Sequence, residues 1–454
     1  MSGCLDEHGG GAPAGVAERE ARLKAAALEL ARVAERIRAT GERTASALLD
    51  PVLTRSALAR PVSALRVHAA LLQAVTSRRG LGFAFGGTLA RLGGVAGMES
   101  LARQVAVTSL RLRIAAVALT HPELLTDPAT RALVDAATGD REIEAGRLLR
   151  AMVAERGASE AMSAVAPIIM EVLAARALVD ENPFNDGCGW AIATGRRPDA
   201  EPLLGLATRA ITRWDRGEGS ATPADAPPGL ATRGGVLGFL GNIAALGTDG
   251  RVLLQEVEGG RYVLHAPGMG FGRPINDTPQ DFVGAGRNAM LNDSPYVRAL
   301  AKAIRAFGVP DGAPLALIGH SEGGAAVMNL AQNPAFCARY RVTHVVCVGS
   351  PIDFKVCADP ETWVASVTNQ HDIVPALDGL GTGSCFADLH PGWYVVDYTH
   401  PSHRFPQCHS IGVYLADLRE HLPAARAHLD ERLAAYRGAV LRSQVYRLHD
   451  REAR

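Results

Sequence analysis

Apolar residues follow two different spacings along the chain, and the change between them divides it into two halves. Over residues 15–216 they recur every three or four positions with arginines between them, which is the spacing of amphipathic helices. Helices are expected at residues 16–39, 61–77, 99–119, 128–137 and 141–156. This half therefore predicts an all-α domain over residues 15–216. It follows a Gly- and Pro-containing N-terminus, residues 1–14, that we expect to be disordered.

In the second half, short apolar runs alternate with helical segments. Strands are expected at residues 251–256, 261–264, 315–318, 343–348, 363–367 and 393–398. Helices are expected at residues 237–246, 295–307, 325–331 and 411–441. The first two strands flank Gly259-Gly260, a natural hairpin turn, and the later alternation is typical of a mostly parallel sheet. We therefore predict an α/β domain over residues 235–442.

Two segments fall outside these domains. Residues 217–234 begin with a Pro-, Gly-, Ser- and Ala-rich stretch, which favours a linker between the halves. Residues 443–454 are interpreted as a C-terminal tail. With 454 residues the chain is long enough for two or three domains and a sizeable core.

Composition narrows the function classes. Hydrophobic residues make up 47% of the chain, charged residues 21%, and the formal net charge is zero, which gives no indication of a nucleic-acid partner. Seven cysteines in no repeating pattern favour free thiols in a reducing compartment over a disulfide framework. A bridge between Cys385 and Cys408 stays open.

No segment has the pattern of an export signal or a membrane span. The N-terminus lacks the basic start and apolar core of a signal peptide. The most apolar window, residues 161–179, contains Pro167, Glu171 and Arg176, which favours a buried helix. We expect a cytoplasmic protein without a transmembrane segment, with non-classical export left open.

One serine lies in a turn that is typical of a catalytic nucleophile. Residues 315–318 are an apolar strand, residues 319–324 read Gly-His-Ser-Glu-Gly-Gly, and a helical run follows. Such a strand–turn–helix exposes the hydroxyl of Ser321 at the end of the sheet. Gly319 and Gly323 let the flanking backbones approach closely. The alternative is an ordinary Gly-rich turn in which Ser321 only caps the helix.

A serine nucleophile needs a histidine base and a carboxylate that orients it. Asp372 lies just past the strand at residues 363–367, and Asp353 is the alternative acid. His409 directly precedes an apolar helical run, which places it at a loop-to-helix junction. Among the other histidines of this loop, His403 is the alternative base, whereas His390 and His400 are interpreted as surface residues.

The transition state also needs donors for an oxyanion. One is expected to be the backbone N–H of Glu322, the residue after the nucleophile. The other is expected in the loop after residues 261–264, where Gly268 leaves room for substrate and the N–H of Met269 is our choice. An ordinary Gly/Pro turn is the alternative interpretation.

No cofactor or metal is expected. Residues 80–87 resemble a loose phosphate loop, but no strand precedes them. Gly268-x-Gly270-x-Gly272 is not followed by a helix, which argues against a dinucleotide site. His400-x-x-His403 with nearby cysteines matches no tight zinc pattern.

Together these residues resemble the α/β-hydrolase superfamily, in particular lipases of the fungal class 3 kind and bacterial serine hydrolases. The matching pieces are Pro267-Gly268-Met269, residues 319–324, Val348-Gly349-Ser350-Pro351, His371-Asp372-Ile373-Val374-Pro375, and His409 with Tyr414-Leu415. The resemblance covers about residues 235–420 and implies an α/β-hydrolase fold preceded by the all-α domain. It implies Ser321 as nucleophile, Asp372 as acid and His409 as base. Glu322 departs from the more usual neutral residue, and Met269 from a small hydroxyl residue.

The expected function is a serine hydrolase that cleaves carboxylic esters through an acyl-enzyme. The resemblance implies a lipid or other acyl ester as substrate, and residues 271–292 could form a cap over it. A thioesterase, acyltransferase or peptidase would use the same residues. The alternative is a protein whose helical half binds a protein partner and whose hydrolase-like domain has little or no activity.

Overall fold

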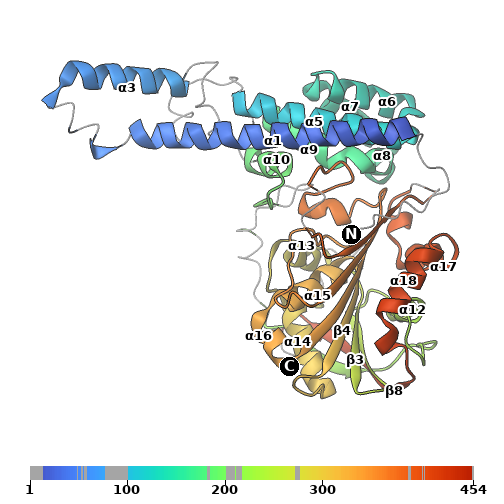
Figure 1. Cartoon of the computed structure of the whole chain (residues 1–454). Coiled ribbons are helices and arrows are strands. Elements are labelled where there is room, and N and C mark those ends of the chain that lie inside the picture. Colours follow the sequence, from blue (N-terminus) through green and yellow to red (C-terminus); the bar gives the residue numbers. More distant parts are fainter. Residues whose placement is uncertain are drawn as a thin grey trace.

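The structure is a computed structural model that describes residues 14–48, 50–52, 55, 59–76, 101–180, 182, 185–200, 210, 217–270, 277–386, 390–400, 402 and 404–451. It has an N-terminal helical region and a mixed eight-stranded sheet with helices on both faces, which is an α/β arrangement (Figure 1). The predicted two-part division of helical half and α/β half is therefore confirmed at this level. Residues 80–87 lie outside the described part.

The helical half contains the five helices expected from the apolar spacing. Its elements are α1 (Ala14–Leu48), α3 (Pro61–Thr76), α5 (Leu101–Thr120), η2 (Pro122–Leu125), α6 (Pro128–Thr138), α7 (Glu142–Arg156), α8 (Ala158–Val165), η3 (Ala166–Ile168), α9 (Ile169–Val179) and α10 (Asp186–Thr194). The start of α6 shows the local cause: Pro128 occupies the first turn, and Asp127 accepts a hydrogen bond from the N–H of Thr130. Leu110, Ile114 and their neighbours form a shared core beneath these helices.

The most apolar segment packs inside this half. The continuous helical stretch Ala158–Val179 is long and apolar enough to span a membrane, but 72% of its most apolar window is buried within the molecule. Glu171, in this stretch, forms a 2.5 Å ion pair with Arg113, and both side chains are fully buried. The burial favours a core helix, as the sequence predicted.

The sheet is mostly parallel. Its strands are β1 (Ser220–Ala224), β2 (Arg251–Val257), β3 (Arg261–Ala266), β4 (Pro314–His320), β5 (Arg341–Val348), β6 (Trp363–Asn369), β7 (Tyr394–Tyr398) and β8 (Val440–His449), in the order β1-β8-β2-β3-β4-β5-β6-β7. From β3 to β7 all neighbours are parallel, whereas β1, β8, β2 and β3 pair antiparallel. Each of the six predicted strands is present, extended by a few residues at one or both ends in most cases.

Helices cover both faces of the sheet (Figure 1). One face carries α14 (Pro295–Phe307), α15 (Glu322–Gln332) and α16 (Pro334–Arg339), and α13 (Phe282–Met290) lies against α15. The other face carries α12 (Val236–Leu246), α17 (Ile411–Glu420) and α18 (Pro423–Arg432), with the short turns η6 (Gln407–His409) and η7 (Ala434–Tyr436). Because the central strand β4 is buried on both faces, it consists of a continuous apolar run rather than an alternating one.

Three predictions about segment boundaries are wrong. Residues 220–224, expected within the linker, form the edge strand β1, where Pro223 is tolerated because an edge strand has an unpaired side. Residues 443–449, expected in a C-terminal tail, belong to β8 between β1 and β2. The single helix expected over residues 411–441 is instead α17, α18 and η7, broken just before Pro423. Strand pairing with a distant partner decides the first two cases, and a local proline decides the third.

The helical half packs against the carboxyl edge of the parallel strands (Figure 1). Ile373 and Ala376, from the loop after β6, belong to the same apolar core as the helical half. Arg113 of α5 donates a 3.0 Å hydrogen bond to the carbonyl of Gly383 in that loop, and Ser163 of α8 donates to the carbonyl of Phe405 at 3.1 Å. The two halves therefore share one interior at the edge where strand-following loops gather.

Candidate active site

Ser321 forms the whole turn between β4 and α15. β4 ends at His320 and α15 begins at Glu322, and Ser321 has φ 58° and ψ −129°. A positive φ is unfavourable for a residue with a side chain and marks strain that the surrounding structure must maintain. The hydroxyl makes no capping bond to the helix, so the interpretation of Ser321 as a simple helix cap is not supported.

The glycines beside Ser321 are required by close packing. A Cβ at Gly319 would lie 2.5 Å from the Cα of Gly324, and one at Gly323 would lie 2.0 Å from the carbonyl oxygen of Ala266. Both distances are far below van der Waals contact. The two motif glycines therefore allow β4, α15 and the end of β3 to meet at the serine, as the sequence predicted.

The structure brings Ser321, His409 and Asp372 together in one hydrogen-bonded chain. The Nε2 atom of His409 lies 2.8 Å from the Ser321 hydroxyl, and its Nδ1 lies 2.6 Å from Oδ2 of Asp372. Asp372 follows β6, and His409 ends η6 just before α17. All three residues are buried, with exposed fractions of 3–4%. This is the arrangement that a serine nucleophile, a general base and an orienting carboxylate require.

The carboxylate of Asp372 is held from two further directions. The hydroxyl of Tyr414, in α17, donates to Oδ2 at 2.8 Å, and the N–H of Val374 donates to Oδ1 at 3.0 Å. The same tyrosine oxygen accepts the N–H of Asn369 at 3.0 Å. Burial, together with the nearby Asp372 charge, raises the pKa of Tyr414 well above its usual range, so the phenol stays a donor.

His320 supports the base from the nucleophile's own strand. Its Nε2–H donates to the carbonyl oxygen of His409 at 2.8 Å, and the two imidazole rings stack. Burial, with a further contribution from His409, lowers the pKa of His320 to about 3, so this ring is neutral at physiological pH. A neutral ring can lie against His409 without opposing the positive charge that His409 would gain as a general base.

The proposed oxyanion loop lies against the serine. A Cβ added at Gly268 would lie 2.6 Å from the Cβ of Ser321 and 3.0 Å from its hydroxyl oxygen. The preceding carbonyl, that of Pro267, accepts a 2.7 Å hydrogen bond from the buried hydroxyl of Tyr296, which anchors the loop. Within the described part of the chain, neither the N–H of Met269 nor that of Glu322 donates to another residue. Both predicted donors are therefore free of competing described partners.

The acidic side chain that follows Ser321 is buried and hydrogen-bonded to α13. Oε1 of Glu322 accepts a 2.7 Å hydrogen bond from the Asn288 amide of α13, and the residue is 3% exposed. Burial raises the pKa of Glu322 well above its usual range. The raised pKa favours the uncharged carboxyl over a negative charge beside the oxyanion that Ser321 chemistry would generate. An acidic residue at position 322, where the resemblance implies a neutral one, therefore does not oppose that chemistry.

The alternative residues do not join this chain of hydrogen bonds. The N–H of Asp353 donates to Oδ2 of Asp378 at 2.8 Å, and Nε2 of His390 lies 2.6 Å from the Asp353 carbonyl. Burial raises the pKa of Asp353 and Asp378, to about 6 for Asp378. His403, the alternative base, lies outside the described residues, as does part of the cap expected at residues 271–292. Every cysteine that the structure describes, Cys385 and Cys408 included, is a free thiol.

Sequence reasoning missed three features of this region. It assigned no function to His320 or to the Tyr414 hydroxyl, since both act through contacts between elements that are distant in the chain. It also did not anticipate that His121, Glu123 and His371 gather where the helical half meets the loop of Asp372. Among the described residues this is the one group with metal-ligand spacing, and it contains neither His400 nor Cys408.

Comparison with models of known protein families, with curated proteins and with solved structures finds no match. A buried Ser–His–Asp chain at a strained strand-to-helix turn, with two backbone N–H groups nearby, is suited to nucleophilic attack on an acyl carbon.

Proposed function

We propose that this protein is a serine hydrolase of the α/β-hydrolase fold that cleaves carboxylic esters. The observation that carries the proposal is the continuous hydrogen-bond chain from Ser321 through His409 to Asp372, with distances of 2.8 and 2.6 Å. It is supported by the positive φ of Ser321, since strained backbone is retained where the surrounding fold enforces it.

The proposed reaction has two stages. In the first, the Ser321 oxygen attacks the ester carbonyl carbon while its proton passes to Nε2 of His409. The N–H groups of Glu322 and Met269 are the proposed donors to the resulting oxyanion. The carbon–oxygen bond to the alcohol then breaks, and His409 returns the proton to the leaving oxygen.

In the second stage, water replaces the alcohol. His409 takes a proton from the water, whose oxygen attacks the acyl-enzyme, and the proton then returns to the Ser321 oxygen as the acid leaves. Asp372 keeps Nδ1 of His409 protonated throughout and stabilises the transient imidazolium. Tyr414 and His320 are positioning residues, because they contact Asp372 and His409 rather than the reacting atoms.

The resemblance to lipases is what favours a lipid or other acyl ester as substrate. Thioesters and amides would pass through the same steps, so the fold and the triad do not select among them. A chain-length series of p-nitrophenyl esters, from acetate to palmitate, separates the cases. A lipase-like enzyme will hydrolyse the longer esters with the higher kcat/KM, and an esterase the shorter ones.

A fluorophosphonate probe tests the proposal directly, because it reacts covalently with an activated serine. Wild type is expected to label, Ser321→Ala is expected not to label, and Ser63→Ala, a change at an exposed serine of α3, is expected to label like wild type. Circular dichroism shows whether each variant is folded. Failure of the wild type to label would remove the enzyme proposal and favour the alternative, a helical partner-binding protein with an inactive hydrolase-like domain.

A further inference from the structure

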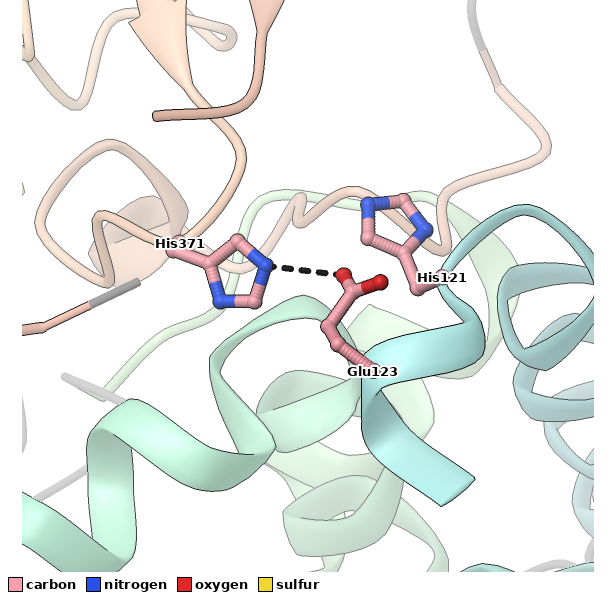
Figure 2. Close-up of side chains that lie close together, drawn as sticks. All are labelled: His121, Glu123 and His371. Carbon is pink, nitrogen blue, oxygen red and sulfur yellow. Dashed lines mark hydrogen bonds and ion pairs between the residues drawn. The ribbon is translucent and has the colours of Figure 1, made fainter. Parts of the chain in front are cut away.

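Two imidazoles and one carboxylate, side chains of the kinds that bind metals, meet between the helical half and the loop that carries Asp372. His121 precedes η2, Glu123 lies in η2, and His371 follows β6 immediately before Asp372. Figure 2 shows the Glu123 carboxylate between the two imidazole rings. One ligand atom from each residue lies within 4.8 Å of the other two. The proposed ester hydrolysis assigns no chemical step to these three residues.

The two histidines of this cluster are buried although their side chains are polar. His121 is 4% exposed and His371 is 2% exposed, whereas the Glu123 side chain is 27% exposed. The histidine rings lie with their centroids 5.9 Å apart. Buried polar side chains are normally retained only where they have specific partners, and two imidazoles with one carboxylate are a frequent donor set for zinc.

Contacts of His121 leave one nitrogen directed at the cluster. Its Nε2 lies 2.9 Å from Oε1 of Gln370, an acceptor, so Nε2–H donates to that oxygen in the metal-free protein. Its Nδ1 lies 3.3 Å from the carbonyl oxygen of Val117, and a bound cation would shift the ring proton to this nitrogen, which leaves Nε2 as the ligand atom and Oε1 of Gln370 as a further oxygen nearby.

On the opposite side, Glu123 already faces His371. Its Oε1 lies 3.0 Å from Nε2 of His371. A zinc ion lies about 2.0–2.2 Å from each ligand, so the ligand atoms must lie within roughly 4 Å of one another. Small shifts of the three side chains are sufficient to reach that spacing.

We propose that His121, Glu123 and His371 bind a divalent cation of the zinc class, which joins the helical half to the loop that carries Asp372. The cation would replace the proton between His371 and Glu123 and be ligated by Nε2 of both histidines and by the carboxylate. Gln370 or a water molecule completes four-coordination. The ion would fix His371, the residue before Asp372, to the helical half. It would therefore position the loop that carries Asp372 and take no part in the proposed ester hydrolysis.

Direct metal binding tests this inference without reference to catalysis. Untagged protein is dialysed against EDTA, and zinc chloride is then titrated calorimetrically. The wild type is expected to bind one equivalent, and cobalt(II) is expected to give the visible absorption of a four-coordinate site. Absence of stoichiometric zinc and cobalt binding by folded wild type would overturn the inference, whether or not Ser321 labels with the probe.

Three variants separate a metal site from a simple hydrogen bond. Glu123→Gln keeps an oxygen acceptor for His371 but removes the ligand charge, and His121→Asn removes one imidazole. Each is expected to weaken zinc binding by about 100-fold or more, since even residues behind the ligands are worth about 10- to 100-fold. His68→Asn, at an exposed histidine of α3, is the matched control and is expected to bind like wild type.

A melting experiment supplies a second readout. Zinc is expected to raise the melting temperature of wild type and His68→Asn by mass action, and to leave that of Glu123→Gln unchanged at the same concentration. Equal zinc affinity and equal melting shifts in wild type, Glu123→Gln and His121→Asn would show that the cluster is only a hydrogen-bonded contact, and would overturn the proposal.

Discussion

The imidazole rings of His320 and His409 lie face to face, with centroids 4.9 Å apart and an interplanar angle of 29°. His320 also donates its Nε2–H to the backbone carbonyl of His409 at 2.8 Å. The residue before the proposed nucleophile thus restricts both the ring and the backbone of the proposed base. Because Ser321 directly follows His320 at the end of β4, the same segment positions the proposed nucleophile and the proposed base.

Replacing His320 is predicted to impair turnover. His320→Phe retains an aromatic ring but loses the hydrogen bond, worth about 1 kcal/mol, so kcat on a p-nitrophenyl ester is expected to fall about fivefold. His320→Ala loses the ring contact as well, so its kcat is expected to fall further, with little change in KM. An unchanged kcat in a folded His320→Ala protein would show that this contact does not position the base.

Tyr414→Phe is predicted to destabilise the protein and reduce activity. The change removes a donor from the Asp372 carboxylate and leaves the buried N–H of Asn369 without its acceptor. Hydrogen bonds to charged groups are worth about 1.5–3 kcal/mol, so a loss of that size in the free energy of unfolding is expected. Denaturant titration measures it, and kcat measures the effect on the triad.

Tyr340→Phe is the matched control for this prediction. The Tyr340 hydroxyl is buried but has no hydrogen-bond partner among the described residues, so its removal is expected to leave stability unchanged or slightly improved. Equal losses in Tyr414→Phe and Tyr340→Phe would mean that the bond to Asp372 contributes nothing specific.

Glu322→Gln is predicted to change how stability depends on pH. The folded protein holds the Glu322 proton above the pKa of an unfolded glutamate, about 4.3, so the folded state binds more protons than the unfolded state above that pH. The free energy of unfolding of wild type therefore falls as pH rises from about 4.3, by about 1.4 kcal/mol for each unit by which burial raises the pKa.

The amide in Glu322→Gln cannot ionise, so the variant does not show this fall in the free energy of unfolding as pH rises. The variant is expected to match wild type near pH 4 and to have the higher melting temperature at pH 8, while the backbone N–H and the reaction with the probe are retained. Glu420→Gln, at an exposed position of α17, is the control and should follow wild type at every pH. If Glu322→Gln also follows wild type, the carboxyl is not protonated in the folded state.

Arg113 and Glu171 are predicted to be strongly coupled. Arg113→Met leaves the Glu171 carboxylate fully buried without its counterion, which is expected to destabilise the protein by about 3–5 kcal/mol. The double variant Arg113→Met/Glu171→Met removes both charges and is expected to recover part of that loss. Urea unfolding of the two single variants and the double variant measures the coupling.

The exposed pair Arg141–Glu144 is the matched comparison. Both side chains are 49% exposed, so Arg141→Met is expected to change stability by less than about 1 kcal/mol. A double variant as unstable as the sum of its single variants would show that Arg113 and Glu171 act independently, despite their 2.5 Å separation.

Much of the fold was predictable because its signals are local. The spacing of apolar residues marked α5, α14 and the parallel strands, and caps and prolines fixed several ends. The edge strand β1 and its neighbour β8 were missed because their sequences resemble a linker and a tail until antiparallel partners are present. Pairing between residues more than 200 positions apart is not encoded in any short window.

For the candidate site, chain order was the useful guide. A serine after one strand, an aspartate after a later strand and a histidine before the final helices could each be chosen by position. Which groups lie within hydrogen-bonding distance could not be derived in this way. The stacking of His320, the tyrosine behind Asp372 and the raised pKa of Glu322 all depend on burial by other elements.

The sequence by itself determined the alternation of helices and strands and the tight turn that holds Ser321, because each depends on neighbours within a few positions. Only the tertiary structure decided that His409 reaches a serine 88 positions earlier, and that the helical half covers the edge where they meet. Hydrogen bonds and burial act between atoms that are close in space, and closeness in space is set by the packing of the whole chain.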